Sequence, residues 1–197
     1  MWNISLKMFF PCFGLALWLG LPAPATVQSQ EREKDMAARG QYLFTVAACS
    51  ACHTVPKGPP HAGGRAFPIP FGKVYATNIT QDKETGIGSW SDKEIRDSIV
   101  KGIRPNGERL IPVMPYEAYS GMAEKDLKAL IVYLRTLKPV RKENLRPKVY
   151  VSLFRPLVTP LWLKLFGRFS NAPGKAPKSG VERGRYLVEH VSLCADC

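Results

Sequence analysis

The chain has 197 residues, 45% of them hydrophobic, which allows one domain of ordinary size plus extensions. Much of its formal net charge of +12 lies in residues 141–185, which carry 11 basic and 2 acidic side chains. A local excess of this kind bears on partners and solubility and excludes nothing about the fold.

The first 25 residues have the pattern of a secretory signal peptide. Lys7 precedes the apolar run MFFPCFGLALWLGL, which is too short and too often broken by Pro and Gly for a membrane span. PAPA then offers an A-x-A cleavage site ending at Ala25. We expect residues 1–25, with Cys12, to be removed and the mature protein to be periplasmic or otherwise extracytoplasmic. An uncleaved N-terminal anchor is the alternative. Nucleic acid is not expected as a partner there.

Residues 36–140 are expected to form a small all-α domain with long loops. Asp35 should cap a first helix that runs into AACSACHT. Ser91 and Glu94 have the spacing of a capping box, and Gly102 should end that second helix. The last helix carries an apolar stripe made of Leu127, Leu130, Ile131 and Leu134.

The first and last helices should cross through small and aromatic residues, namely Gly40, Tyr42, Leu43, Tyr133 and Leu134. Nothing in residues 36–140 alternates clearly like a strand. Residues 54–80 and 103–121 are expected to be loops, and loops of that length need something to pack on.

After this domain, residues 141–181 are expected to be a basic linker packed on a domain surface. Its apolar run VYVSLFRPLVTPLWLKLFGRF offers a second interpretation, a contact with a membrane surface or a partner subunit.

The chain then repeats a motif. RGQYLFTVAACSAC begins at Arg39 and RGRYLVEHVSLCADC begins at Arg183. A second domain is therefore expected to begin at residue 182. The residue after Cys52 is His53, whereas Cys197 is the last residue of the sequence. We expect residues 182–197 to be the truncated start of this domain, and the chain to be a fragment.

Cys49, Cys52 and His53 spell C-x-x-C-H, the attachment signal of c-type haem. Two cysteines at this spacing can form thioethers with the haem vinyl groups, and the next residue can bind the iron. The other ring nitrogen of His53 should donate to a carbonyl in the following loop. The long loops would then wrap the haem.

A sixth iron ligand is expected from the opposite side, and a thioether there raises the reduction potential. Met114 is the best placed, in the loop between the last two helices. The rivals are less suitable: Met36 starts the haem-binding helix, Met122 starts the last helix, and His61 lies in a Gly/Pro-rich loop. Trp90, Tyr75 and Asn78 are candidates for lining the haem or binding a propionate.

Other functions of the cysteines remain open at this point. A thiol-redox pair needs a βαβ context, and none is visible. The two C-x-x-C pairs are too far apart for the usual zinc spacing. Local disulfides are chemically allowed, and a haem enzyme with an open, peroxidase-like iron site would share the same motif.

Several stretches resemble the multihaem cytochrome c subunits of alcohol, gluconate and related membrane-bound dehydrogenases. These are RGQYLFTVAACSACHT, AGGRAFPIPFGKVYATNIT, DKETGIGSWSDKEIRDSIVKGIRPNG, MPYEAYSGMAEKDLKALIVYLRTLKPV and RGRYLVEHVSLCADC.

The resemblance implies tandem class I cytochrome c-like domains in the periplasm, each with one covalent haem c and His/Met ligation. It assigns Cys49, Cys52, His53 and Met114 to the first haem, and Cys194 and Cys197 to the thioethers of a second. It implies one-electron transfer, not catalysis on a substrate, with a dehydrogenase subunit or a quinol or cytochrome redox partner of the respiratory chain. Ala123 departs from the family, which has a Ser or Thr helix cap there.

Overall fold

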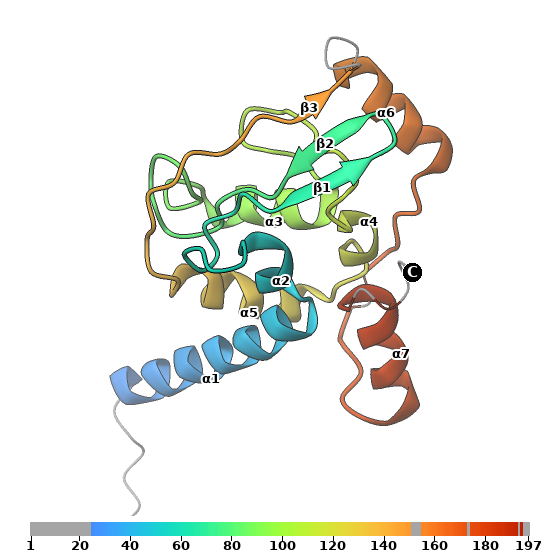
Figure 1. The fold of residues 1–197 in the computed structure, drawn as a ribbon. Coiled ribbons are helices and arrows are strands. Elements are labelled where there is room, and N and C mark those ends of the chain that lie inside the picture. The colour runs from blue at the N-terminus through green and yellow to red at the C-terminus, as the bar shows by residue number, and fades with distance from the viewer. Residues whose placement is uncertain (1–24, 151–154, 173, 193, 195–197) are drawn as a thin grey trace, which may run out of the picture.

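A computed structural model describes residues 25–150, 155–172, 174–192 and 194 (Figure 1). The predicted signal peptide lies outside these residues except for Ala25, and so does Cys197. The helices are α1 (Ala25–Val46), α2 (Cys49–His53), α3 (Asp92–Lys101), α4 (Tyr116–Tyr119), α5 (Glu124–Arg135), α6 (Arg155–Phe166) and α7 (Gly180–His190), and the strands are β1 (Ala66–Ile69), β2 (Gly72–Tyr75) and β3 (Lys148–Val149).

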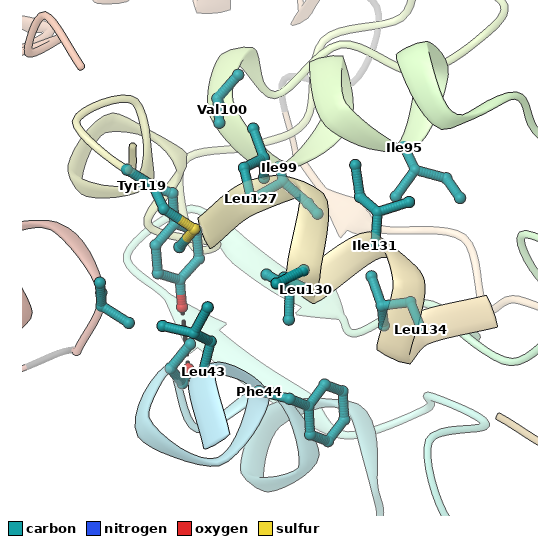
Figure 2. Close-up of a cluster of buried hydrophobic side chains, with 14 of the residues drawn as sticks. Leu43, Phe44, Ile95, Ile99, Val100, Tyr119, Leu127, Leu130, Ile131 and Leu134 are labelled. Atoms are coloured by element: carbon teal, nitrogen blue, oxygen red, sulfur yellow. Dashed lines mark hydrogen bonds between the residues drawn. The ribbon is translucent and has the colours of Figure 1, made fainter. Parts of the chain in front are cut away.

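The apolar core is built around α5, which lies between α1 and α3 (Figure 2). Side chains from the three helices point toward one another there. The stripe predicted for the last helix is confirmed, because its members are at most 5% exposed: Leu127, Leu130, Ile131 and Leu134. A helix of 12 residues is marginal on its own in water, so burial of this stripe is what stabilises α5.

The predicted ends of the helices agree with the structure in α3 but not in α1. Ser91 and Glu94 form the capping box, and Gly102 ends α3 in the left-handed conformation with φ 63°. Helix α1, however, starts at Ala25, so Asp35 lies inside it and the prediction of a cap there was wrong. Residues 26–34 contain no Pro or Gly and include Gln, Glu, Arg and Lys, which favour helix, so nothing stops the helix from extending.

Helices α1 and α5 cross in direct contact at Gly40. A Cβ on Gly40 would lie 2.0 Å from the carbonyl oxygen of Ala129 and 2.7 Å from the Cβ of Tyr133. Phe44 and Tyr133 add an edge-to-face ring pair with centroids 5.1 Å apart. The predicted crossing of the first and last helices is therefore confirmed. Tyr42 is not part of it, because its side chain is 48% exposed.

A small antiparallel sheet, not expected from the sequence, accompanies the helices. Strands β1 and β2 form a hairpin, and β3 pairs with β2 from the other side. Pro68 is compatible with a strand because β1 is at the edge. Gly72 has φ 146°, and a Cβ there would lie 2.1 Å from the carbonyl oxygen of Lys148, so glycine permits the approach of β3. The predicted cytochrome c-like fold is confirmed as mostly helical, and it also contains this small sheet.

The stretch predicted as a linker contains β3 and α6. Helix α6 includes Pro160, and its large apolar side chains are mostly exposed, among them Leu157, Leu161, Trp162, Leu165 and Phe166. Within the described residues, none of the helices combines the length and the apolar character needed to cross a membrane.

Helix α7, in which the second copy of the repeat begins, docks on the first domain near α4 (Figure 1). Tyr186 is 4% exposed, and its hydroxyl accepts the N–H of Ala123 at 2.9 Å and donates to Oδ2 of Asp126 at 3.1 Å. Ala123 is the N-cap of α5 and provides no side-chain cap. The tyrosine therefore joins the cap N–H to the Asp126 carboxylate, a pairing that a capping box makes directly.

The Asp126 carboxylate is fully buried and also receives two arginines. Nε of Arg39, on α1, donates to Oδ1 at 2.6 Å, and Nη1 of Arg183, on α7, donates to Oδ2 at 3.3 Å. Arg39 and Arg183 are equivalent residues in the two copies of the repeat. One carboxylate thus holds together the first helix of each copy and the last helix of the first domain.

Candidate functional site

A cavity opens between α2, the hairpin, α3 and the loop that precedes α4. The space it encloses, including its open mouth, is about 1360 Å³. Many of its lining side chains are aliphatic, for example Ile79, Ile87, Ile95, Ile99, Leu130 and Leu134. A large apolar cavity with few polar groups is typical of a cofactor site.

The C-x-x-C-H residues line this cavity from the short helix α2. Ala48 adopts the left-handed conformation, with φ 52° and ψ 29°, and separates helix α1 from helix α2. The turn brings Cys49, Cys52 and His53 to the cavity wall. The thiols of Cys49, Cys52 and Cys194 are free, without a disulfide bond.

His53 is held as a neutral ring with one nitrogen available for a metal. Its Nδ1 lies 2.7 Å from the carbonyl oxygen of Thr77. A carbonyl only accepts, so Nδ1 carries the hydrogen and Nε2 keeps its lone pair. Burial lowers the pKa of His53, which also favours the neutral ring. The expected bond to a carbonyl in the following loop is confirmed, with Thr77 as the acceptor.

The two cysteines do not have the properties of a reactive thiol pair. Burial raises the pKa of Cys49 to about 12, and burial also raises the pKa of Cys52. Thiol-redox cysteines need a lowered pKa, because the thiolate is the nucleophile. In the described part of the chain, no group of three or more His, Cys, Asp or Glu residues is arranged to hold a metal ion.

Met114 lines the same cavity from the loop before α4. Its rivals lie elsewhere. Met122 is 1% exposed in the apolar core, and Met36 packs against that core. His61 makes an edge-to-face contact with Phe44, with centroids 5.1 Å apart. These placements keep Met114 as the candidate thioether ligand.

The three residues considered for lining or propionate binding divide into two groups. Tyr75 and Trp90 line the cavity. Asn78 does not, because it is 2% exposed and its amide is bonded to residues of the protein. Sequence reasoning missed Leu145 and Pro147, which line the cavity from the stretch assigned to the linker. Neither carries a motif that could have identified it.

The second C-x-x-C pair can be followed only in part. Cys194 is exposed and lies just beyond α7. Cys197 falls outside the described residues. The chemical interpretation therefore rests on the first site. Its apolar cavity, paired cysteines, neutral histidine and methionine fit a c-type haem.

Comparisons with known proteins point the same way. Residues 37–138 match the family model described as Cytochrome c. Over 93% of its length, the chain is 35% identical to the gluconate 2-dehydrogenase cytochrome c subunit of Pantoea cypripedii, covering 42% of that protein. Over 94% of its length, it is 33% identical to the cytochrome c subunit of the alcohol dehydrogenase (quinone) of Gluconacetobacter polyoxogenes, covering 40%. A diheme cytochrome c-type protein of Cereibacter sphaeroides is 27% identical over 92% of the chain, which covers 63% of that protein.

The chain thus spans about two fifths of the length of the dehydrogenase subunits that it matches. The family resemblance predicted from the sequence is confirmed. These relatives are named as cytochrome c subunits, which agrees with an electron carrier and not with a substrate-converting enzyme. The chain belongs to the cytochrome c family, whose cofactor is covalently bound haem c.

Proposed function

We propose that this chain transfers single electrons through a haem held by Cys49, Cys52, His53 and Met114, as part of the cytochrome subunit of a respiratory dehydrogenase. The observation that carries the proposal is the C-x-x-C-H helix α2 on an apolar cavity that Met114 also lines. When bound, the haem supplies an Fe(III)/Fe(II) couple.

Each residue has a distinct task in this proposal. Cys49 and Cys52 form thioethers, which keep the cofactor attached outside the cytoplasm. His53 offers Nε2 to the iron because Thr77 holds its Nδ1–H. Met114 offers its thioether sulfur, a ligand that raises the reduction potential.

The proposal extends to the second copy of the repeat and to the surroundings of the protein. Cys194 and Cys197 attach a second haem in a protein that continues into a second cytochrome domain. Residues 1–25 direct export to the periplasm. The redox partner is a dehydrogenase subunit, or alternatively a quinol or another cytochrome.

The surface of α6 supports an association of this kind. Leu157, Leu161 and Leu165 follow one another at intervals of four residues and are 54% to 71% exposed. An exposed apolar row marks an interaction surface. We propose that it contacts a partner subunit, with a membrane surface as the alternative.

The first test is expression of the chain with a c-type cytochrome maturation system, followed by intact mass, peptide mapping and the absorption spectrum. We expect one covalent haem on the peptide that contains Cys49 and Cys52, with a low-spin spectrum. A protein without covalent haem contradicts the proposal. A high-spin spectrum favours an open, peroxidase-like iron site instead.

A further inference from the structure

The chain does not leave the first domain after α5. Residues 140–149, which we name the strap, run back along the domain and end in β3 (Figure 1). Leu145 and Pro147 of the strap line the cavity, and its last two residues pair with Gly72 and Lys73. The strap is therefore a wall of the candidate haem site, although it lies beyond the residues that match the family model, 37–138.

The strap is fastened to a buried asparagine. The amide nitrogen of Asn78 donates to the carbonyl oxygen of Val140 at 2.7 Å and to Oγ1 of Thr85 at 3.1 Å. Its amide oxygen accepts from the hydroxyl and N–H of Thr80, at 2.7 and 2.9 Å. Both ends of the amide are thus used within the protein. Asn78 is a structural joint between its own loop and the strap.

Asn144 of the strap reaches the same loop with both ends of its side chain. Its Oδ1 accepts the backbone N–H of Asn78 at 2.7 Å, and its Nδ2 donates to the carbonyl oxygen of Thr85 at 2.6 Å. The orientation of the amide follows from these partners, since one is a donor and the other an acceptor.

Asn144 and His53, the proposed haem ligand, form hydrogen bonds to the same peptide unit. The carbonyl of Thr77 and the N–H of Asn78 belong to the same planar group. Its oxygen accepts from Nδ1 of His53 at 2.7 Å, and its nitrogen donates to Oδ1 of Asn144. A hydrogen bond at one end of a peptide polarises it and strengthens the bond at the other.

A lysine of the strap fastens the other side of His53. Nζ of Lys142 donates to the carbonyl oxygen of Gly63 at 2.8 Å, and the N–H of Gly63 donates to the carbonyl oxygen of His53 at 2.8 Å. A Cβ on Gly63 would lie 2.4 Å from the carbonyl carbon of Thr77. The two backbone segments that hold the histidine are therefore in contact, and the strap binds both.

We propose that the strap positions the histidine ligand, and that Asn144, acting through the Thr77–Asn78 peptide, tunes the reduction potential of the first haem. This rests on the proposed function, in which His53 binds the iron. A stronger bond to Nδ1–H makes the imidazole a better donor and stabilises Fe(III). Removing the Asn144 acceptor therefore weakens the His53 bond and raises the potential.

The test compares Asn144→Ala with Asn144→Asp in the haem-loaded chain. Asn144→Ala should shift the reduction potential upward and speed hydrogen exchange at the Asn78 amide. Asn144→Asp keeps the acceptor oxygen, so the Asn78 amide should stay protected and the potential should not rise. Asn106→Ala is the matched control, because Oδ1 of Asn106 also accepts a backbone N–H, that of Glu108 at 3.1 Å, in a different loop.

The outcomes separate this inference from the proposed function. If the unsubstituted chain attaches no haem, the proposed function itself fails. If haem is attached and Asn144→Ala has the potential and the Asn78 exchange rate of the Asn106→Ala control, the role of Asn144 is refuted. If Asn144→Ala does not accumulate, Asn144→Asp decides, because a raised potential with the Asn78 amide still protected, or an unchanged potential with that amide unprotected, refutes it.

Discussion

Replacing the two glycines of the repeated motif should have opposite effects on stability. Gly40 and Gly184 occupy the same position of the repeat, and both lie inside helices. A Cβ on Gly40 would collide with the backbone of Ala129 at 2.0 Å, whereas a Cβ on Gly184 would meet no atom of the described residues within 4 Å. The pair therefore isolates the steric effect from the change in helix propensity.

The magnitudes decide the sign in each case. Alanine favours a helix interior over glycine by about 1 kcal/mol. At Gly184 no contact with the described part of the chain opposes this gain, so Gly184→Ala should stabilise by about 0.5–1 kcal/mol. Overpacking a core costs about 1–3 kcal/mol, and the atom struck at Gly40 is backbone, so the upper end applies. After the gain in propensity, Gly40→Ala should lose about 2 kcal/mol.

Guanidinium unfolding and thermal unfolding of the haem-loaded chain, both followed by far-UV circular dichroism, measure the free energy of unfolding and the Tm of each variant. A loss of about 2 kcal/mol corresponds to a Tm lower by about 8–16 °C for a domain of this size. If Gly40→Ala were as stable as the unsubstituted protein, the close crossing of α1 and α5 would be disproved. Equal destabilisation by Gly184→Ala would show that α7 is packed at a face that the structure leaves open.

Four further substitutions test the iron ligand, the docking of α7 and the pH dependence of stability. Met114→Ala should lower the reduction potential and abolish any weak methionine–iron band, whereas Met122→Ala should cost about 2–5 kcal/mol of stability and leave the potential unchanged. Tyr186→Phe should cost about 1–3 kcal/mol, seen as faster hydrogen exchange in α7, because the hydroxyl has two buried partners. Two lysines on α3 bind the Asp97 carboxylate and lower its pKa. The contribution of Asp97 to the stability of the fold is therefore present above the ordinary carboxylate pKa and is lost as the pH falls. Asp97→Asn should flatten acid unfolding curves.

Features encoded by neighbouring residues were predictable from the sequence. The capping box of α3 needs only Ser91 and Glu94, and the stripe of α5 shows in its four-residue spacing. The C-x-x-C-H motif likewise places three chemical groups on one short helix. In each case the physical cause lies within one or two helical turns.

Features that depend on distant residues were not predictable. The hairpin contains Pro68 and Gly72, which disfavour a strand unless it is known which strand is at the edge and where another backbone approaches. The bond from Asn144 to Asn78 joins residues 66 apart and has no periodic signal. Tyr42 is exposed and Tyr186 is buried although they match in the repeat, because Tyr186 docks on Ala123 and Asp126 of the first domain.

The shared carboxylate of Asp126 has a consequence for how haem domains can be added in series. It binds the arginine of its own domain and the arginine of the next copy, so a single residue fixes both the inside of one module and the joint to its neighbour. A module that repeats both the arginine and the carboxylate would join the next one by the same rotation and translation. Successive haems would then be related by a constant rotation and spacing along the chain.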